Sequence, residues 1–148
     1  MNNVNFFKKI IYKFIKIYWK VFKPQTCGVK VIIENKGKLV YIINNYGSKL
    51  KNLPGGKIEK NENPIQAGIR EVKEELDIDI FDIQNIDKIF SNKEGKRDTI
   101  FIIYAKTKAE TFNIDKFEIL EANWFSLNDL SGFCTTAQKI LKIFLKNN

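Results

Sequence analysis

The sequence contains no histidine, which removes the commonest general base and the commonest zinc ligand of proteins. It has only two cysteines, Cys27 and Cys134, and their separation matches neither a metal-ligand spacing nor a disulfide framework. A cysteine nucleophile would usually need a histidine partner, so cysteine catalysis is disfavoured as well. We therefore expect a reducing, cytoplasmic environment, and any acid–base or metal chemistry must depend on carboxylates.

Low-complexity tracts and internal repeats are also lacking, and the hydrophobic share of 44% is typical of a globular chain. A length of 148 residues suffices for one domain with a sizeable core. The net charge of +8 is unevenly distributed, because residues 1–23 contain six lysines and no acidic residue. The sequence therefore predicts a basic N-terminal segment at residues 1–23 and a nearly neutral catalytic domain at residues 24–148.

The basic segment has the pattern of an amphipathic helix over residues 5–22, with lysines on one face and apolar residues on the other. Lysines interrupt each apolar run, which argues against a signal peptide and against a membrane-spanning helix. Three roles stay open for this segment. Its apolar face can dock onto the domain or onto a second copy in a homodimer, or the segment can contact a membrane surface or a nucleic acid.

The rest of the chain reads as short strands with one helix in the middle and one at the end. The predicted strands, in chain order, are residues 27–34, 38–44, 78–90 with an irregularity, 99–106, and a strand that carries Trp124. The first two are expected to form a hairpin at Asn35, Lys36 and Gly37. The closing helix is expected over residues 137–145, capped by Thr135 or Thr136.

The middle helix has clear start and stop signals. The Asn63 side chain can accept from the first free N–H groups, Pro64 suits the first helical position, and Gln66 stands where a capping box needs an amide. Apolar residues recur at helical spacing from there to Leu76. The helix should therefore end near Asp77.

Three carboxylates share one face of this helix, because Glu71, Glu74 and Glu75 are related by the spacings i, i+3 and i+4. Each like-charge pair costs roughly 0.2–0.5 kcal/mol on an exposed helix. A bound cation would offset that repulsion, and oxygen ligands suit a hard ion such as Mg²⁺ or Mn²⁺. The alternative is a solvated charged face on which Arg70 pairs with Glu74.

The stretch from Gly56 to Ile78 resembles the Nudix box, G-x5-E-x7-R-E-U-x-E-E-x-G-U, in which U is a bulky aliphatic residue. The matching residues are Gly56, Glu62, Arg70, Glu71, Val72, Glu74, Glu75 and Ile78. Asp77 stands where the family has glycine. Because aspartate tolerates the left-handed conformation better than most residues, we expect a small stability cost there and no loss of metal binding.

The resemblance covers residues from about 26 to the end, and it implies an α+β fold: a Nudix-like α/β/α sandwich with a mixed sheet, here preceded by the N-terminal amphipathic helix. It also implies Mg²⁺-dependent hydrolysis of a diphosphate linkage in a nucleoside diphosphate derivative, with Mn²⁺ as an alternative ion. The expected metal ligands are Glu71, Glu74, Glu75 and the Gly56 carbonyl. The general base is expected among Glu74, Glu75, Glu118 and Glu121.

Other residues of the predicted site have supporting roles. Arg70 is expected to orient the carboxylates, and Glu62 to brace the preceding loop against Arg70. The candidate substrate-binding residues are Gly55, Gly56, Glu59 and Tyr46.

The substrate class depends on signatures outside the box. The proline, tyrosine, coenzyme A and NADH signatures that mark Nudix subfamilies outside the box are lacking, which favours a (deoxy)nucleoside triphosphate or a small nucleotide conjugate. An RNA 5′ pyrophosphohydrolase is an alternative, supported by the basic segment. A non-catalytic module that binds nucleotides or RNA, and a membrane-tethered scaffold, are alternatives of another class.

Overall fold

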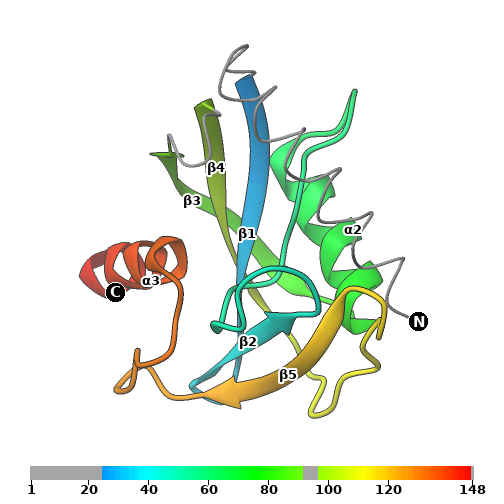
Figure 1. The fold of residues 1–148 in the computed structure, drawn as a ribbon, viewed down its shortest axis with the longest axis vertical. Helices are drawn as coiled ribbons and strands as arrows, with labels where there is room; N and C mark the ends of the chain where they lie inside the picture. Colours follow the sequence, from blue (N-terminus) through cyan, green and yellow to red (C-terminus); the bar gives the residue numbers. More distant parts are fainter. Residues whose placement is uncertain (1–24, 92–96, 148) are drawn as a thin grey trace.

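The computed structural model describes residues 25–91 and 97–147, which form a five-stranded mixed sheet with helices packed on it (Figure 1). The elements are β1 (Gln25–Asn35), β2 (Lys38–Asn44), α2 (Pro64–Leu76), β3 (Phe81–Ser91), β4 (Arg97–Lys106), β5 (Ile119–Phe125) and α3 (Thr135–Asn147). The predicted N-terminal helix lies outside the described residues. None of the described helices is both long enough and apolar enough to cross a membrane.

The strands lie in the order β3-β4-β1-β2-β5, with β1 and β4 parallel and every other neighbouring pair antiparallel. The tight connection between β1 and β2 confirms the predicted hairpin, because Asn35 pairs with Lys38 across two turn residues. Lys36 and Gly37 both have positive φ, 51° and 74°, as a two-residue hairpin turn requires. The parallel pairing of β1 with β4 places β1 at the centre of the sheet.

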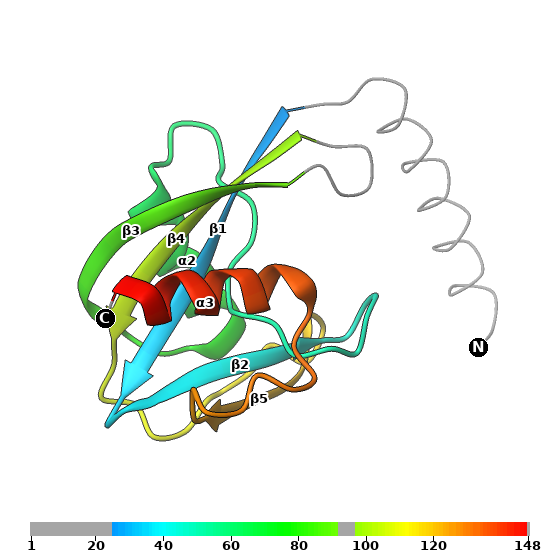
Figure 2. The same ribbon diagram turned by 90° about the vertical axis from the view of Figure 1, so that its left-hand side faces the viewer.

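One helix covers each face of the sheet, and each face has its own core (Figures 1 and 2). On one face, Ala67, Val72 and Leu76 of α2 pack with alternate residues of β1, including Val29 and Val31. On the other face, α3 contributes a second apolar set, which packs with Ile32 of β1. The period of two along β1 therefore separates the two cores, and the predicted α/β/α sandwich is confirmed.

The loop after β2 lies along the N-terminal half of β1, where β2 has turned away. Val31 N donates to Pro54 O and Val29 N donates to Gly56 O, both at 2.9 Å, and Lys57 forms a bridge with Gly28. This loop extends the sheet locally, and it ends immediately before α2. The arrangement places residues 53–57 beside β1 and within hydrogen-bond distance of side chains on the carboxylate-bearing helix.

Several boundaries differ from the sequence-based predictions by one to three residues, and two of them affect a predicted feature. The helix α3 begins at Thr135, so Thr135 is a helical residue and the cap position falls to Cys134, whose carbonyl accepts from Gln138 N at 3.0 Å. The strand predicted over residues 78–90 begins only at Phe81, and its expected irregularity is present beside Asp82, which has a positive φ of 51°.

Candidate active site

The predicted ends of the carboxylate-bearing helix α2 are confirmed. Asn63 Oδ1 accepts from Gln66 N at 2.9 Å and Gln66 Oε1 accepts from Asn63 N at 3.0 Å, so both halves of the capping box are present. At the other end Asp77 adopts the left-handed conformation, with φ 52° and ψ 40°, and its N–H donates to Lys73 O. Asp77 thus takes the backbone geometry for which the Nudix box has glycine.

Arg70 ties the loop before α2 to the carboxylates on the helix. Its Nε and Nη2 donate to the two carboxylate oxygens of Glu62 at 2.9 and 3.0 Å, and Nη2 also donates to Lys57 O. Its Nη1 donates to Glu71 at 2.9 Å and to Glu74 at 3.0 Å. The hydrogen bond from Arg70 lowers the pKa of Glu62. This geometry has the form expected of a brace between loop and helix.

The two consecutive glycines place the loop backbone against the carboxylates. Gly55 has a φ of +123°, and a Cβ there would lie 2.3 Å from Val29 O, so only glycine fits. Gly55 N donates to Glu75 Oε2 at 2.8 Å. A Cβ on Gly56 would lie 2.6 Å from Glu71 Oε1. Position 55 therefore needs glycine because the β1 backbone lies so close, and a Cβ at position 56 fits only if the Glu71 carboxylate moves.

Burial and mutual repulsion set the charge state of this cluster. Glu75 is only 4% exposed, and burial raises its pKa to about 7, against the opposing charge of Lys30. Burial also raises the pKa of Glu71. The negative charge of Glu118 acts in the same direction on the pKa values of both residues. Glu71, Glu75 and Glu118 thus interact electrostatically in one place, although Glu118 is far from the other two in sequence.

The structure separates the two candidates for a carboxylate near β5. Glu118 precedes the strand, where its carbonyl accepts from Asn45 N at 2.7 Å, and its charge acts on the cluster. Glu121 lies within β5 and accepts from the Tyr41 hydroxyl at 2.5 Å. Because Tyr41 belongs to the core on the α3 face, Glu121 is directed away from α2. The structure therefore brings Glu118, and not Glu121, to the carboxylate cluster.

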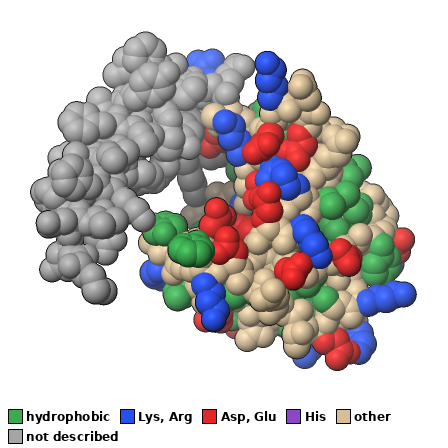
Figure 3. All heavy atoms as spheres, turned by 90° about the vertical axis from the view of Figure 1, so that its right-hand side faces the viewer, with side chains coloured by type: hydrophobic (Ala, Val, Ile, Leu, Met, Phe, Trp, Pro, Cys, Tyr) green, Lys and Arg blue, Asp and Glu red, His purple; other side chains and the backbone are tan. Residues whose placement is uncertain are grey.

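The two other predicted substrate-binding residues, Tyr46 and Glu59, have exposed side chains. Tyr46 is 60% exposed in the loop after β2. Glu59 takes part through its backbone, since its N–H donates to Glu62 Oε2 at 3.0 Å, whereas its side chain is exposed. The face that carries α2 shows acidic side chains gathered together with basic side chains between them (Figure 3).

The donor set fits a hard divalent cation. Across residues 25–91 and 97–147, no group of three or more acidic or cysteine side chains already has the arrangement of a metal site, and Arg70 holds oxygens of Glu71 and Glu74. Burial raises the pKa values of Glu71 and Glu75, neighbouring carboxylates raise them further, and a bound cation would favour the charged form of both groups. Gly56 O accepts from Val29 N and keeps a second lone pair for a cation.

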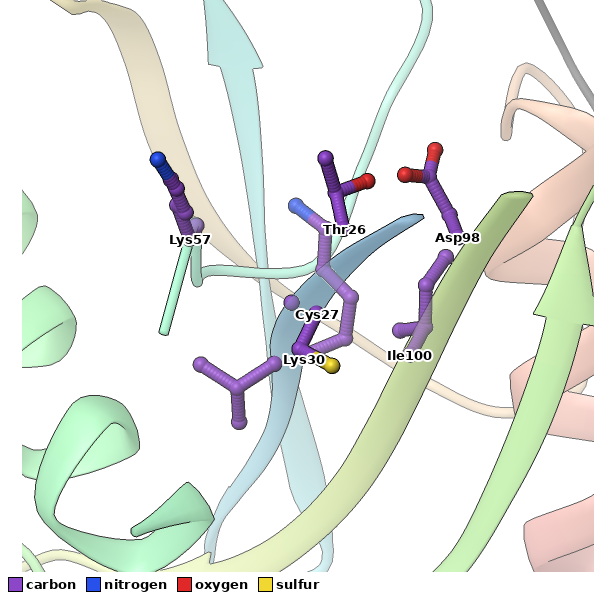
Figure 4. Close-up of a pocket in the computed structure, with 9 residues that line it drawn as sticks. Thr26, Cys27, Lys30, Lys57, Asp98 and Ile100 are labelled. Carbon is purple, nitrogen blue, oxygen red and sulfur yellow. The ribbon is translucent and has the colours of Figure 1, made fainter. Parts of the chain in front are cut away.

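A pocket of about 260 Å³ lies beside the same loop, at the N-terminal end of β1 (Figure 4). Its walls include Thr26, Lys30 and Lys57, and Asp98 and Ile100 of β4 form the opposite side. Neither Lys30 nor this pocket was predicted from the sequence. The available signal was a lysine in the middle of an apolar strand, between Val29 and Val31.

Comparisons with known proteins agree with this geometry. The family model of the NUDIX domain matches residues 24–147. The mRNA-decapping enzyme subunit 2 and the m7GpppN-mRNA hydrolase, from two strains of Saccharomyces cerevisiae, are each 32% identical over 123 residues. That match covers 82% of this chain but only 12% of either yeast protein, so the chain spans about an eighth of their length.

Solved structures show the same fold at low sequence identity. The MutT protein from Methanosarcina mazei Go1 has a TM-score of 0.73 at 21% identity, covering 85% of this chain and 96% of that one. The MutT NUDIX hydrolase from Burkholderia pseudomallei has a TM-score of 0.72 at 20% identity, covering 80% and 96%. The residue-level match of the box, the sheet order and the family model lead to one conclusion: this chain belongs to the NUDIX domain family.

Proposed function

We propose that this protein is a divalent-metal-dependent hydrolase that cleaves a phosphoanhydride bond in a nucleotide derivative. Membership of the family implies a pyrophosphohydrolase activity. The observation that carries the proposal is the cluster of Glu71, Glu75 and Glu118 around the Gly55–Gly56 loop. A (deoxy)nucleoside triphosphate or a small nucleotide conjugate is the favoured substrate, and the pocket beside Lys57 is large enough for part of such a molecule.

Glu71, Glu74, Glu75 and the Gly56 carbonyl would hold Mg²⁺ or Mn²⁺. When bound, the ion neutralises the diphosphate and makes a nearby water more acidic. Arg70 keeps the carboxylates of Glu71 and Glu74 beside the loop through its hydrogen bonds. Lys57, on the same loop, adds a positive charge at the pocket that favours a phosphate group.

Glu118 is the best-placed general base. Glu74 is paired with Arg70, Glu75 accepts from Gly55 N, and Glu121 accepts from Tyr41, whereas no hydrogen bond or ion pair of the described residues occupies the Glu118 carboxylate. A water molecule attacks one phosphorus, the bond to the bridging oxygen breaks, and Glu118 accepts the proton that the water loses. The products are two phosphate-bearing fragments, and the bridging oxygen leaves on one of them.

The test is phosphate and pyrophosphate release from a panel of nucleotides and nucleotide conjugates, with Mg²⁺ and with Mn²⁺. The wild-type protein should act on one compound class only when a metal is added. Glu75→Gln and Glu118→Gln should each lose most turnover with unchanged circular dichroism, whereas Glu121→Gln is the matched control and should retain it. Binding of nucleotides without any release would favour the non-catalytic module instead, although the box retains all its charged positions.

RNA with a 5′ triphosphate or a cap is the second candidate substrate. The 32% identity to an mRNA-decapping enzyme over most of the domain favours it, and so does the basic charge of residues 1–23. Triphosphorylated and m7GpppN-capped RNA belong in the same panel. Release from RNA that exceeds release from free nucleotides would establish this class.

The N-terminal segment and the location of the protein stay predictions. Residues 1–23 lie outside the described residues, so docking within a homodimer, a membrane contact and a nucleic-acid contact remain alternatives. Flotation of the protein with anionic liposomes, with and without residues 1–23, tests the membrane role. Equal flotation of both forms would remove it. A cytoplasmic location is proposed from the cysteine content alone.

A further inference from the structure

Lys30 has an unusual position for a lysine. It lies in β1, the central strand, and alternates with Val29 and Val31, whose side chains pack against α2. Its own side chain therefore leaves the sheet on the α3 side, as that of Ile32 does. From there Nζ reaches the loop at the sheet edge and donates to Leu53 O at 2.7 Å and to Gly55 O at 3.1 Å. Figure 4 shows this side chain in the wall of the pocket.

The two contacts complete a regular pattern along the loop. The carbonyls of Pro54 and Gly56 accept from backbone N–H groups of β1, and the carbonyls of Leu53 and Gly55 accept from Lys30. Four consecutive carbonyls, from residue 53 to residue 56, are thus held in alternating directions. Lys30 is the donor to the two carbonyls, of Leu53 and Gly55, that accept no hydrogen bond from the β1 backbone.

The orientation of these carbonyls decides where the Gly55 N–H points. A trans peptide unit is planar, so its N–H is directed opposite to its C=O. The Pro54 carbonyl points to β1, and the Gly55 N–H of the same unit accordingly points away from β1, to Glu75 Oε2 at 2.8 Å. Gly55 has a φ of +123°, which glycine adopts without a steric penalty. Hydrogen bonds hold both peptide units beside it, because Val31 N donates to Pro54 O in the unit that precedes it. Lys30 supports the unit that follows it.

Lys30 also places a positive charge near the carboxylates without bonding to them. Its charge opposes the effect of burial on the pKa of Glu75, and burial lowers the pKa of Lys30 itself. Arg70 differs in this respect, because its hydrogen bonds occupy oxygens of Glu71 and Glu74 directly. With Lys30 bound to carbonyls, Glu75 Oε1 remains available to a cation.

We propose that Lys30 is a positioning residue of the hydrolase site: it holds the Gly55–Gly56 loop in the orientation that presents Glu75 and the Gly56 carbonyl to a divalent cation. This inference rests on the proposed function, but its test does not need turnover. The alternative is a lysine that only stabilises the fold. The two roles differ in whether metal affinity and local loop opening change while the global fold does not.

The experiment uses Mn²⁺ binding, followed by electron paramagnetic resonance without substrate, and amide hydrogen exchange at Gly55. Lys30→Met removes the charge and the donors but keeps the apolar stem, and Lys30→Arg keeps charge and donors. The matched control is Lys38→Met, since Lys38 is exposed and its side chain makes no hydrogen bond or ion pair with the described residues. Circular dichroism monitors the fold of each variant.

Lys30→Met should raise the Mn²⁺ dissociation constant about tenfold or more, the range found when partners of metal ligands are removed. The Gly55 amide should exchange faster, whereas amides in the α3 core keep their protection. Lys30→Arg should recover part of the affinity, and Lys38→Met should match the wild type. If Lys30→Met does not fold, Lys30→Gln, which is uncharged but keeps a donor, replaces it with the same expectations.

Wild-type Mn²⁺ affinity and wild-type Gly55 exchange in a folded Lys30→Met or Lys30→Gln protein would overturn the proposal. A loss of affinity that tracks a general loss of protection throughout the core would also overturn it, in favour of the purely stabilising role. Failure of the proposed function looks different. In that case the wild-type protein binds Mn²⁺ and shows the predicted response to Lys30→Met, but it releases phosphate from no compound in the panel.

Discussion

Glu75→Gln should stabilise the metal-free protein at alkaline pH, although it removes a residue of the proposed active site. Burial raises the pKa of the Glu75 carboxyl from its ordinary value of 4.5 to about 7. A difference of about 2.5 pKa units corresponds to about 3 kcal/mol, at about 1.4 kcal/mol per unit. Glutamine has the same shape, carries no charge, and keeps an oxygen that can accept from Gly55 N.

The sign of the pH dependence follows from the raised pKa. The folded protein binds the Glu75 proton more tightly than the unfolded chain, so ionisation of this group lowers stability as pH rises. The cost is absent below about pH 4.5, grows between that value and about pH 7, and is constant above. The gain from Glu75→Gln should therefore be about 3 kcal/mol at pH 8 and less than about 1 kcal/mol at pH 5.

Urea unfolding in the presence of EDTA, followed by circular dichroism at pH 5 and at pH 8, measures this difference. The matched control is Glu74→Gln on the same helix, because the Glu74 side chain is 59% exposed and its change should stay within about 1 kcal/mol. Addition of Mg²⁺ should stabilise the wild type more than Glu75→Gln, since the ion binds the folded state. An equal or smaller gain at pH 8 than at pH 5 would refute the argument that buried ionised Glu75 destabilises the metal-free protein.

Three further substitutions test other contacts. Gly56→Ala places a Cβ 2.6 Å from the Glu71 carboxylate, so Mn²⁺ affinity should fall by about tenfold or more while circular dichroism is unchanged; unaltered affinity would contradict the close approach. Arg70→Lys loses the paired hydrogen bonds to Glu62 and should cost about 1–3 kcal/mol in urea unfolding; a neutral result would mean that the brace contributes nothing. Asp77→Gly removes a left-handed aspartate and its exposed ion pair with Lys73, and it introduces a residue that adopts the left-handed conformation readily. Its stability should change by less than about 1 kcal/mol and its Mn²⁺ affinity should not change, so a large loss of affinity would show that Asp77 acts on the site.

Much of the helix α2 could be predicted because its signals are local. The capping box joins Asn63 to Gln66, and the ion pair of Arg70 with Glu74 spans one helical turn, so the residues that interact are also close in sequence. The hairpin at Lys36 and Gly37 was predictable for the same reason. The helix start at Thr135 was not predictable from local signals, because threonine is as suitable before a helix as in its first turn.

Spacing alone could not distinguish Glu118 from Glu121. Their separation of three residues across the start of β5 places one carboxylate beside the α2 cluster and the other on Tyr41 at the α3 face. That difference depends on where β5 begins and on its pairing with β2, which shifts register between Ile43 and Asn44. A one-residue change in register reverses the face of every side chain, so the tertiary arrangement decides which acid is near the site.

The sequence by itself determined the family and the position of the carboxylate-bearing helix, because both depend on residue types at fixed local spacing. Only the tertiary structure brings Lys30 to the Gly55 carbonyl and distinguishes Glu118 from Glu121, since these residues come from β1 and from the start of β5. Burial, which arises when α2 packs on the sheet, is the largest cause that raises the pKa of Glu75 to about 7. The local sequence pattern determines which chemical groups are present, and packing determines which residues surround them and at what pH they are charged.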